Sequence, residues 1–189
     1  MKKLILGLMI SCVLNLFGCN SGGIEGSGGQ EPQQPTTVGG AAQKGPFVIG
    51  SSITISYLDI DGSATSINTQ TQTTDSIGNF SFAIEQTGPA QIQAKGYHLN
   101  EITGELSSGE LTLRAIYNIS SDDEQAAFVN ILTHLIHNRV LTLMANNLDI
   151  NTAISQAQNE LLEGLAPVLD KPNDLLFTSL SVYNVEGSD

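Results

Sequence analysis

The chain has 189 residues, with 19 acidic side chains against seven Lys and Arg, and its formal net charge is −12. So few basic residues argue against binding to nucleic acid, because basic side chains are needed to neutralise a phosphate backbone. Charged residues make up 14 % of the chain, against ~25 % in an average protein, which argues against a long charged helix or coiled coil. The length fits one ordinary domain, or a small domain with a tail.

Residues 1–18 are predicted to form a signal peptide. Lys2 and Lys3 precede an apolar run over residues 4–17, which is shorter than the ~20 residues that a membrane-spanning helix needs. The run leads into Leu-Phe-Gly-Cys at residues 16–19, which resembles the lipobox of bacterial lipoproteins. The resemblance implies cleavage before Cys19 and attachment of lipid to its thiol. Because Asn20 rather than Asp follows, it also implies the outer membrane of a Gram-negative cell. The alternative is an ordinary secretory signal with an incidental cysteine.

Residues 19–43 are expected to be a flexible tether. Gly, Ser, Gln and Pro dominate this stretch, which has too few apolar residues to offset the entropy of ordering. The two cysteines of the chain are Cys12 and Cys19. Removal of the signal peptide and lipidation of Cys19 would therefore leave no thiol for a disulfide, a nucleophile or a metal site.

Residues 44–120 are predicted to form a small β-sandwich. Short segments rich in β-branched residues alternate apolar and polar positions, roughly ten residues apart, with Gly and Asp turns between them. The expected strands lie at 53–58, 69–73, 80–84, 90–94 and 110–116. The segment at 69–73 alternates Thr and Gln, which is typical of a strand in contact with solvent.

Two motifs of this region resemble a known family. Lys-Gly-Pro-Phe at 44–47 opens a predicted strand, and T-D-x-x-G-x-F-x-F occupies residues 74–82; together they resemble carboxypeptidase regulatory-like, or transthyretin-like, domains. Gly96-Tyr97 and the motif at 100–104 are also similar to a group of uncharacterised bacterial lipoproteins. The resemblance implies a β-sandwich that stabilises or binds rather than catalyses.

The segment around Asp75 has a local explanation. Its carboxylate can accept hydrogen bonds from the following backbone, and Gly78 can take a positive φ before the Phe-rich strand. A calcium site would need further ligands, for which Asp59 and Asp61 are candidates, but the chain has no D-x-D-x-D spacing. A structural turn is the favoured interpretation.

Residues 121–189 are predicted to be a helical hairpin and a C-terminal segment. Residues 121–124 read Ser-Asp-Asp-Glu, a capping box for a first helix, and a second helix is expected from Thr152. Both helices carry an apolar stripe that must pack on the sandwich or on a partner. The strand-like stretch at 175–185 either docks on the helices or belongs to a truncated, longer protein. The predicted fold class is therefore mainly β plus α: a lipidated tether, a small β-sandwich and an αα-hairpin.

The candidates for chemistry are few. His134 and His137 lie three residues apart on the first predicted helix and are weak candidates for metal ligands, with His98 or a distant acid as a third. No nucleophile elbow, phosphate loop or dinucleotide fingerprint occurs. We therefore expect no enzyme, no cofactor and no catalytic residue. A metal-dependent hydrolase using His134 and His137 is the alternative.

A covalent cross-link is a further alternative. Lys44 opens the first expected strand and Asn118 closes the last, an arrangement similar to the Lys–Asn isopeptide of surface adhesins. Glu85 or Glu101 would be the catalytic acid.

The functional expectation is a lipid-anchored outer-membrane lipoprotein that binds or scaffolds. Its partners would be the membrane, through lipid on Cys19, and an envelope protein or polysaccharide, contacted through the Thr/Gln strand or the sandwich loops. Nucleic acid is excluded by the charge.

Overall fold

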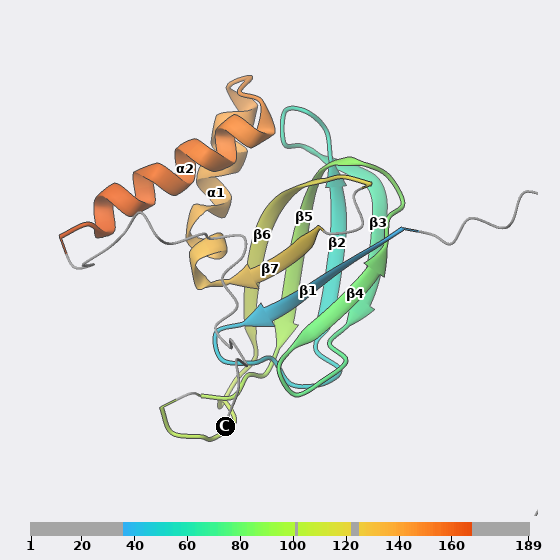
Figure 1. The fold of residues 1–189 in the computed structure, drawn as a ribbon, viewed down its shortest axis with the longest axis vertical. Helices are drawn as coiled ribbons and strands as arrows, with labels where there is room; N and C mark the ends of the chain where they lie inside the picture. Colours follow the sequence, from blue (N-terminus) through green and yellow to red (C-terminus); the bar gives the residue numbers. More distant parts are fainter. Residues whose placement is uncertain (1–35, 101, 122–124, 168–189) are drawn as a thin grey trace, which may run out of the picture. The chain divides into compact units, whose positions relative to one another are not determined.

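The computed structural model describes residues 36–100, 102–121 and 125–167. Within these ranges, seven β-strands are followed by two α-helices (Figure 1). The predicted signal peptide, Cys19, most of the predicted tether and the segment at 175–185 lie outside the described residues.

A four-stranded antiparallel sheet has the order β3-β2-β5-β6. Its strands are β2 (Ser52–Leu58), β3 (Ala64–Gln72), β5 (Gly88–Gly96) and β6 (Leu111–Ile119). All four confirm predicted strands. In β2, β5 and β6 the residues on one face are buried and the intervening residues are more exposed, whereas β3 has only exposed and half-exposed residues, as expected for a strand in contact with solvent.

A three-stranded sheet has the order β4-β1-β7. The predicted strand β4 (Asn79–Ala83) pairs antiparallel with β1 (Thr37–Gln43), and β7 (Ala126–Asn130) pairs parallel with β1. Two expectations are wrong here. The tether does not extend to Gln43, because β1 begins at Thr37. Lys44 follows the end of β1 instead of opening a strand.

Small residues allow β1 to lie in the middle of its sheet. A Cβ added at Gly40 would collide with the backbone carbonyl of Ala127 on β7 and would lie 2.8 Å from the ring of Phe80 on β4. Val38 and Ala42 are buried on the same strand. A glycine-rich sequence is typical of a linker, but in β1 the absence of a side chain at Gly40 permits close approach of the neighbouring strands.

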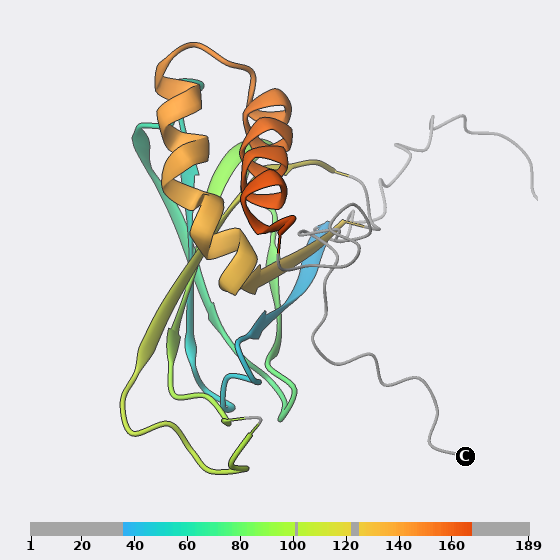
Figure 2. The same cartoon turned by 90° about the vertical axis from the view of Figure 1, so that its left-hand side faces the viewer.

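The main core lies between the inner faces of the two sheets, which pack as a sandwich (Figure 2). Alternate residues of β2, β5 and β6 face residues of β1, β4 and β7. The largest fully buried side chains of this core are Phe47, Ile53, Ile55, Tyr57, Ile92 and Leu113.

The turn between β3 and β4 forms as the sequence predicts. Asp75 Oδ1 accepts hydrogen bonds from the N–H groups of Ile77 (3.1 Å) and Asn79 (2.9 Å), and Oδ2 accepts one from Asn79 Nδ2 (2.7 Å). Gly78 has a φ of 82°. Partial burial acts to raise the pKa of the Asp75 carboxyl, but the hydrogen bonds from Asn79 and Ile77 outweigh it and lower that pKa.

Helix α1 (Ile131–Ala145) begins later than predicted. The segment expected to be its first turns contains β7, and the cap is Asn130 instead of Ser121. Asn130 Oδ1 accepts a hydrogen bond from Thr133 N, while Asn130 N donates one to Thr133 Oγ1, both at 2.9 Å. This reciprocal pair is a capping box, which ends β7 and starts α1 at the same residue.

Helix α2 (Ile150–Leu165) follows a short loop and forms the predicted αα-hairpin with α1. The loop contains Asn147 in a left-handed conformation, with a φ of 66°. A second core joins the helices to Leu58 and Ile116. Because Ile116 lies between two residues of the main core along β6, it points to the outer face of the four-stranded sheet. The helices contact it there and lie beside the β6 end of the sheet (Figure 2).

Among the described helices, neither is both long enough and apolar enough to cross a membrane.

Candidate functional site

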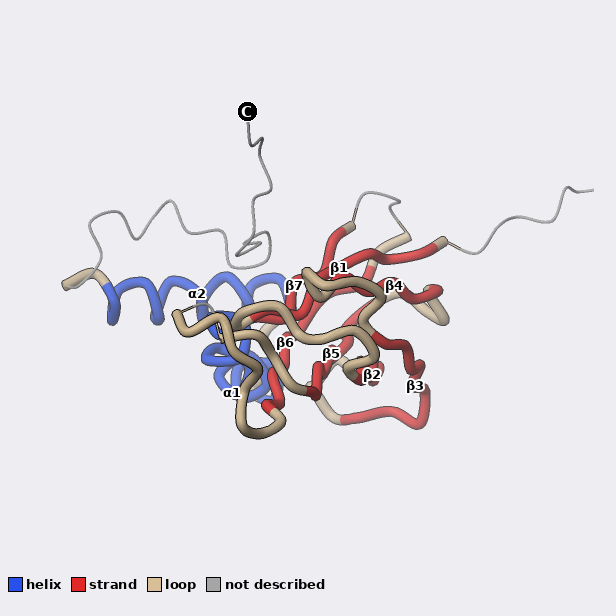
Figure 3. Tube along the Cα trace, turned by 90° about the horizontal axis from the view of Figure 1, so that it is seen from below, coloured by secondary structure: helices blue, strands red, loops and turns tan. Residues whose placement is uncertain are grey.

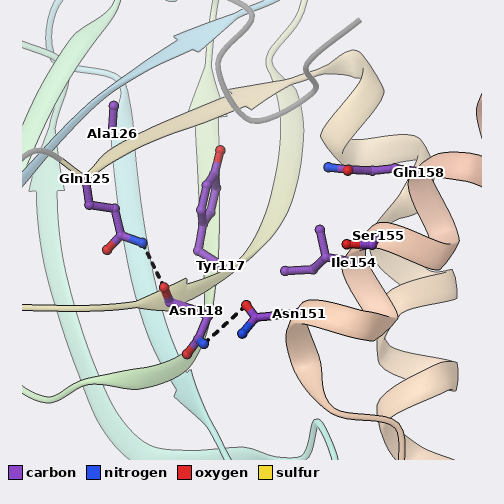
Figure 4. Close-up of a pocket in the computed structure, with 8 residues that line it drawn as sticks. All are labelled: Tyr117, Asn118, Gln125, Ala126, Asn151, Ile154, Ser155 and Gln158. Carbon is purple, nitrogen blue, oxygen red and sulfur yellow. Dashed lines mark hydrogen bonds between the residues drawn. The ribbon is translucent and has the colours of Figure 1, made fainter. Parts of the chain in front are cut away.

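A groove lies between the β6–β7 edge of the sandwich and helix α2 (Figure 4). Its volume is about 390 Å³. We call it the amide groove, because four of its eight lining residues carry side-chain amides. The lining consists of Tyr117, Asn118, Gln125, Ala126, Asn151, Ile154, Ser155 and Gln158.

Gln125 forms one wall of the amide groove by binding the exposed edge of β6. Its Nε2 donates to the carbonyl of Asn118 (2.7 Å), and its Oε1 accepts from the N–H of Ser120 (2.9 Å). The side-chain amide thus makes the two hydrogen bonds that a neighbouring strand would make. It satisfies this part of the edge before the chain turns into β7.

Tyr117 forms the floor and joins the two sheets. Its hydroxyl accepts a hydrogen bond from Phe128 N (2.7 Å) and donates one to Phe128 O (2.9 Å). The side chain is 5 % exposed, and burial raises the pKa of the phenol well above its ordinary value. The floor is therefore a rigid, neutral aromatic surface.

Helix α2 supplies the opposite wall. Asp149 caps its first turn by accepting from the N–H groups of Asn151 (2.9 Å) and Thr152 (3.3 Å). The lining residues at positions 151, 154, 155 and 158 follow helical spacing and share one face of the helix. Asn118 Nδ2 donates to Asn151 Oδ1 at 3.3 Å, which ties the helix to β6 (Figure 4).

The chemistry of the amide groove is polar and uncharged. None of its lining side chains is acidic or basic, although the chain carries a net charge of −12. Side-chain amides and a serine hydroxyl both donate and accept hydrogen bonds, while Ile154 points from α2 toward Tyr117 to provide apolar surface (Figure 4). A few polar groups around an apolar surface are typical of a small-molecule or cofactor site.

A second cavity adjoins the amide groove and shares Asn118 with it. It lies between the β2–β3 turn and the α1–α2 loop, with a volume of about 800 Å³. Asp59, Asp61 and Asp149 line it. Asp61 accepts from the backbone and hydroxyl of Ser63, and Asp149 caps α2, so these two carboxylates already serve local structure.

His134 and His137 bind protein groups instead of facing a common site. His134 Nδ1 accepts a hydrogen bond from Arg114 N at 3.2 Å, at the outer edge of β6. His137 is buried, with Nε2 2.7 Å from Gln91 Oε1 and Nδ1 2.9 Å from Asn138 Oδ1. Burial and the positive charge of Arg114 lower the pKa of His134.

Burial is also the main cause that lowers the pKa of His137.

Within the described ranges, no three His, Cys, Asp or Glu side chains are grouped so that they could hold a metal ion. His98 packs near Phe47, with ring centroids 6.1 Å apart, in the loop after β5. The described geometry therefore gives the metal-dependent alternative no support.

The other candidate pairs also lie apart. Lys44 follows Gln43, which pairs with Asn130 at the end of β7, whereas Asn118 is bonded to Gln125 just before β7 begins. A Lys–Asn cross-link would have to span the length of that strand, so the described register gives this alternative no support. Asp61 and Asp75 occupy the turns at opposite ends of β3 and do not form a shared calcium site.

Sequence reasoning missed the amide groove because its residues belong to different elements. Gln125 follows β6, and Asn118 was weighed only as a cross-linking residue. The i, i+3, i+4, i+7 spacing of Asn151, Ile154, Ser155 and Gln158 was the one available signal. This spacing indicates that the four residues share one face of a helix, but it does not indicate which element lies opposite that face.

The chain was compared with protein-family models, with curated proteins and with solved structures, and none of them matches it.

Proposed function

We propose that this chain is a lipid-anchored binding module of the bacterial cell envelope, and that the amide groove takes part of an uncharged polysaccharide. The observation that carries the binding proposal is the lining of the groove. Four amides, one serine and an apolar floor match a ligand with many hydroxyl groups and no charge.

The electrostatics favour this class over acidic polymers. A net charge of −12 repels polyanions at long range, and the amide groove holds no basic side chain to bind an acidic sugar. An uncharged polysaccharide is not repelled by the net charge and needs no basic side chain for binding. Polysaccharide chains can also continue along the surface beyond the cavity, so that several weak contacts add to the affinity.

Anchoring is supported by the sequence before the described residues. The lipobox-like Leu-Phe-Gly-Cys at residues 16–19 would place lipid on Cys19. Each buried methylene contributes about 0.8 kcal/mol, so attachment by more than one acyl chain is stable without basic residues. We propose the outer membrane, facing either the periplasm or the cell surface.

Binding is tested with the full chain in detergent against a panel of soluble, uncharged oligosaccharides of glucose, mannose and N-acetylglucosamine. Polygalacturonate fragments serve as the acidic comparison. We expect at least one uncharged series to bind, with affinity rising with chain length, and Gln158→Ala to weaken binding about three- to tenfold through loss of a hydrogen bond.

The matched control is Asn159→Ala, the next residue along α2, which is exposed and lies outside the groove. It should bind like the parent chain. Binding that prefers the acidic fragments, or that is equally reduced by both variants, would contradict the proposal.

Anchoring is tested by feeding cells a clickable palmitate analogue. The parent chain should be labelled and should fractionate with the outer membrane. The Cys19→Ser variant should carry no label and should not fractionate with the outer membrane. Labelling of Cys19→Ser would show that the lipid is elsewhere. An unlabelled parent chain would mean an ordinary secretory signal.

A further inference from the structure

Strand β3 is an exposed edge of the four-stranded sheet. The sheet order ends at β3, and no described strand pairs with its outer side. Figures 1 and 3 show it on the side of the sheet away from the helices. Every residue from Ala64 to Gln72 is exposed or half-exposed. An edge strand presents backbone N–H and C=O groups that can pair with another chain.

The edges at β6 and β7 carry side chains that bind their backbone groups. Gln125 binds the Asn118 carbonyl of β6 and the N–H of Ser120, which directly follows this strand. His134 accepts from Arg114 N further along β6, and the Tyr117 hydroxyl binds both backbone groups of Phe128 on β7. These bonds block strand addition on that side. The same chain therefore closes one side of the sandwich and leaves β3 accessible.

The sequence of β3 lacks the features that prevent pairing. Ala-Thr-Ser-Ile-Asn-Thr-Gln-Thr-Gln contains no charged residue and no proline over nine residues. Natural edge strands are usually protected by lysine, proline or shortness. In a chain of net charge −12, an uncharged strand is also a surface where two copies can meet without direct repulsion.

We propose that β3 pairs antiparallel with β3 of a second copy, about a two-fold axis at Asn68. This register places Asn68 opposite itself, Ile67 opposite Thr69 and Thr65 opposite Thr71. Thr–Thr and β-branched pairs are favourable across strands. The two four-stranded sheets join into one of eight strands, and the interface is closed at two copies because it uses the same strand of each.

The pairing accounts for an exposed apolar residue. Ile67 is 41 % exposed and lies on the same face of β3 as Thr65, Thr69 and Thr71, because side chains alternate along a strand. Thr69 Oγ1 donates to Glu85 Oε1 at 3.3 Å, so this face is turned toward the end of β4. In the dimer, Ile67 is covered by Thr69 of the second copy.

One local bond must be exchanged. Asn68 Nδ2 donates to the Ser66 carbonyl of its own strand at 3.4 Å, which is long for an amide–carbonyl bond. Ladder hydrogen bonds from the second strand replace it. Because this inference rests on β3, it stands or falls separately from ligand binding in the amide groove.

The test is oxidative cross-linking of the full chain in membranes, using Asn68→Cys. Residues opposite each other in an antiparallel pair have Cβ atoms close enough for a disulfide. We expect a disulfide-linked dimer on a non-reducing gel, at several times the yield of Asn159→Cys, an exposed position on α2. The parent chain reports any background from Cys12 and Cys19.

A second measurement does not depend on cysteine. Asn68→Asp places two carboxylates at the two-fold axis, and we expect the dimer dissociation constant measured by sedimentation to rise about fivefold at low salt, with partial recovery in high salt. Asn159→Asp adds the same charge elsewhere and should leave dimerisation unchanged. A monomeric parent chain, equal cross-linking of both cysteine variants, or cross-linking of Asn68→Cys to a different protein would overturn the proposal.

Discussion

The hydroxyl of Tyr117 binds both backbone groups of Phe128, accepting from its N–H at 2.7 Å and donating to its C=O at 2.9 Å. This single side chain connects β6 of one sheet to β7 of the other, on the side of the sandwich where the amide groove lies. The relationship explains why β7, a strand of five residues, holds its position beside a sheet with which it forms no ladder.

We expect Tyr117→Phe to lower the free energy of unfolding by about 1–3 kcal/mol, because two partly buried backbone groups lose their partner. Tyr57→Phe is the matched control. The Tyr57 hydroxyl accepts one bond, from Glu85 N at 3.1 Å, so its loss should cost less. Urea unfolding followed by circular dichroism measures both, and an equal or larger effect of Tyr57→Phe would be against this role of Tyr117.

The parallel pairing of β1 with β7 is tested by two adjacent glycines. Gly40→Ala should destabilise the fold by more than about 3 kcal/mol, since its Cβ meets the Ala127 carbonyl and backbone cannot move aside cheaply. Gly39→Ala meets nothing within 4 Å and should be neutral or stabilising by up to about 1 kcal/mol. Thermal melts of the two variants decide the matter, and similar effects would show that β1 does not pack as described.

The stability that the Asp75 turn contributes should decrease in acid. Its folded-state pKa is lowered, so the stability it contributes is present above the ordinary value of 3.8 and is lost as pH falls through the folded pKa. Asp75→Asn should cost about 1 kcal/mol at pH 7, because the bond from Asn79 Nδ2 is lost. Stabilities of the two proteins should approach each other toward pH 2.5; a constant difference across that range would refute the assignment.

His134 should make stability fall under mild acid. Its pKa is lowered in the folded state, so below the ordinary value of 6.5 the unfolded chain binds more protons and folding weakens. His134→Gln keeps an acceptor for Arg114 N without titrating. Its urea midpoint should therefore change less between pH 7.5 and 5.0 than that of the parent chain. A variant with the same pH dependence would mean that His134 protonates without consequence for folding.

Local patterns predicted the parts of the fold whose partners are near in sequence or whose burial repeats regularly. Alternation located β2, β5 and β6, and the Asp75 turn could be derived from the hydrogen-bonding capacity of one carboxylate. The apolar stripes of α1 and α2 were equally visible. These signals succeed because alternating burial, an apolar stripe and a turn hydrogen bond can each be recognised within one segment, without knowing which distant segment packs against it.

The two missed strands, β1 and β7, depend on distant partners. Thr37–Gln43 is rich in glycine and alanine because it lies between two strands, and the same composition is typical of a linker. Ala126–Asn130 has the residues of a helix start, but its backbone pairs with β1 more than eighty residues earlier. Tertiary pairing here overrides local preference, and with these strands unseen the amide groove could not be assembled.

The most direct test of the binding account is a ¹⁵N-labelled NMR titration of the full chain with the uncharged oligosaccharide that binds best. The account predicts that the side-chain amide signals of Asn118, Asn151 and Gln158 shift together and saturably, while that of Asn159 stays unchanged. Saturable shifts confined to β3 or to the β5–β6 hairpin, with the groove amides unmoved, would contradict it.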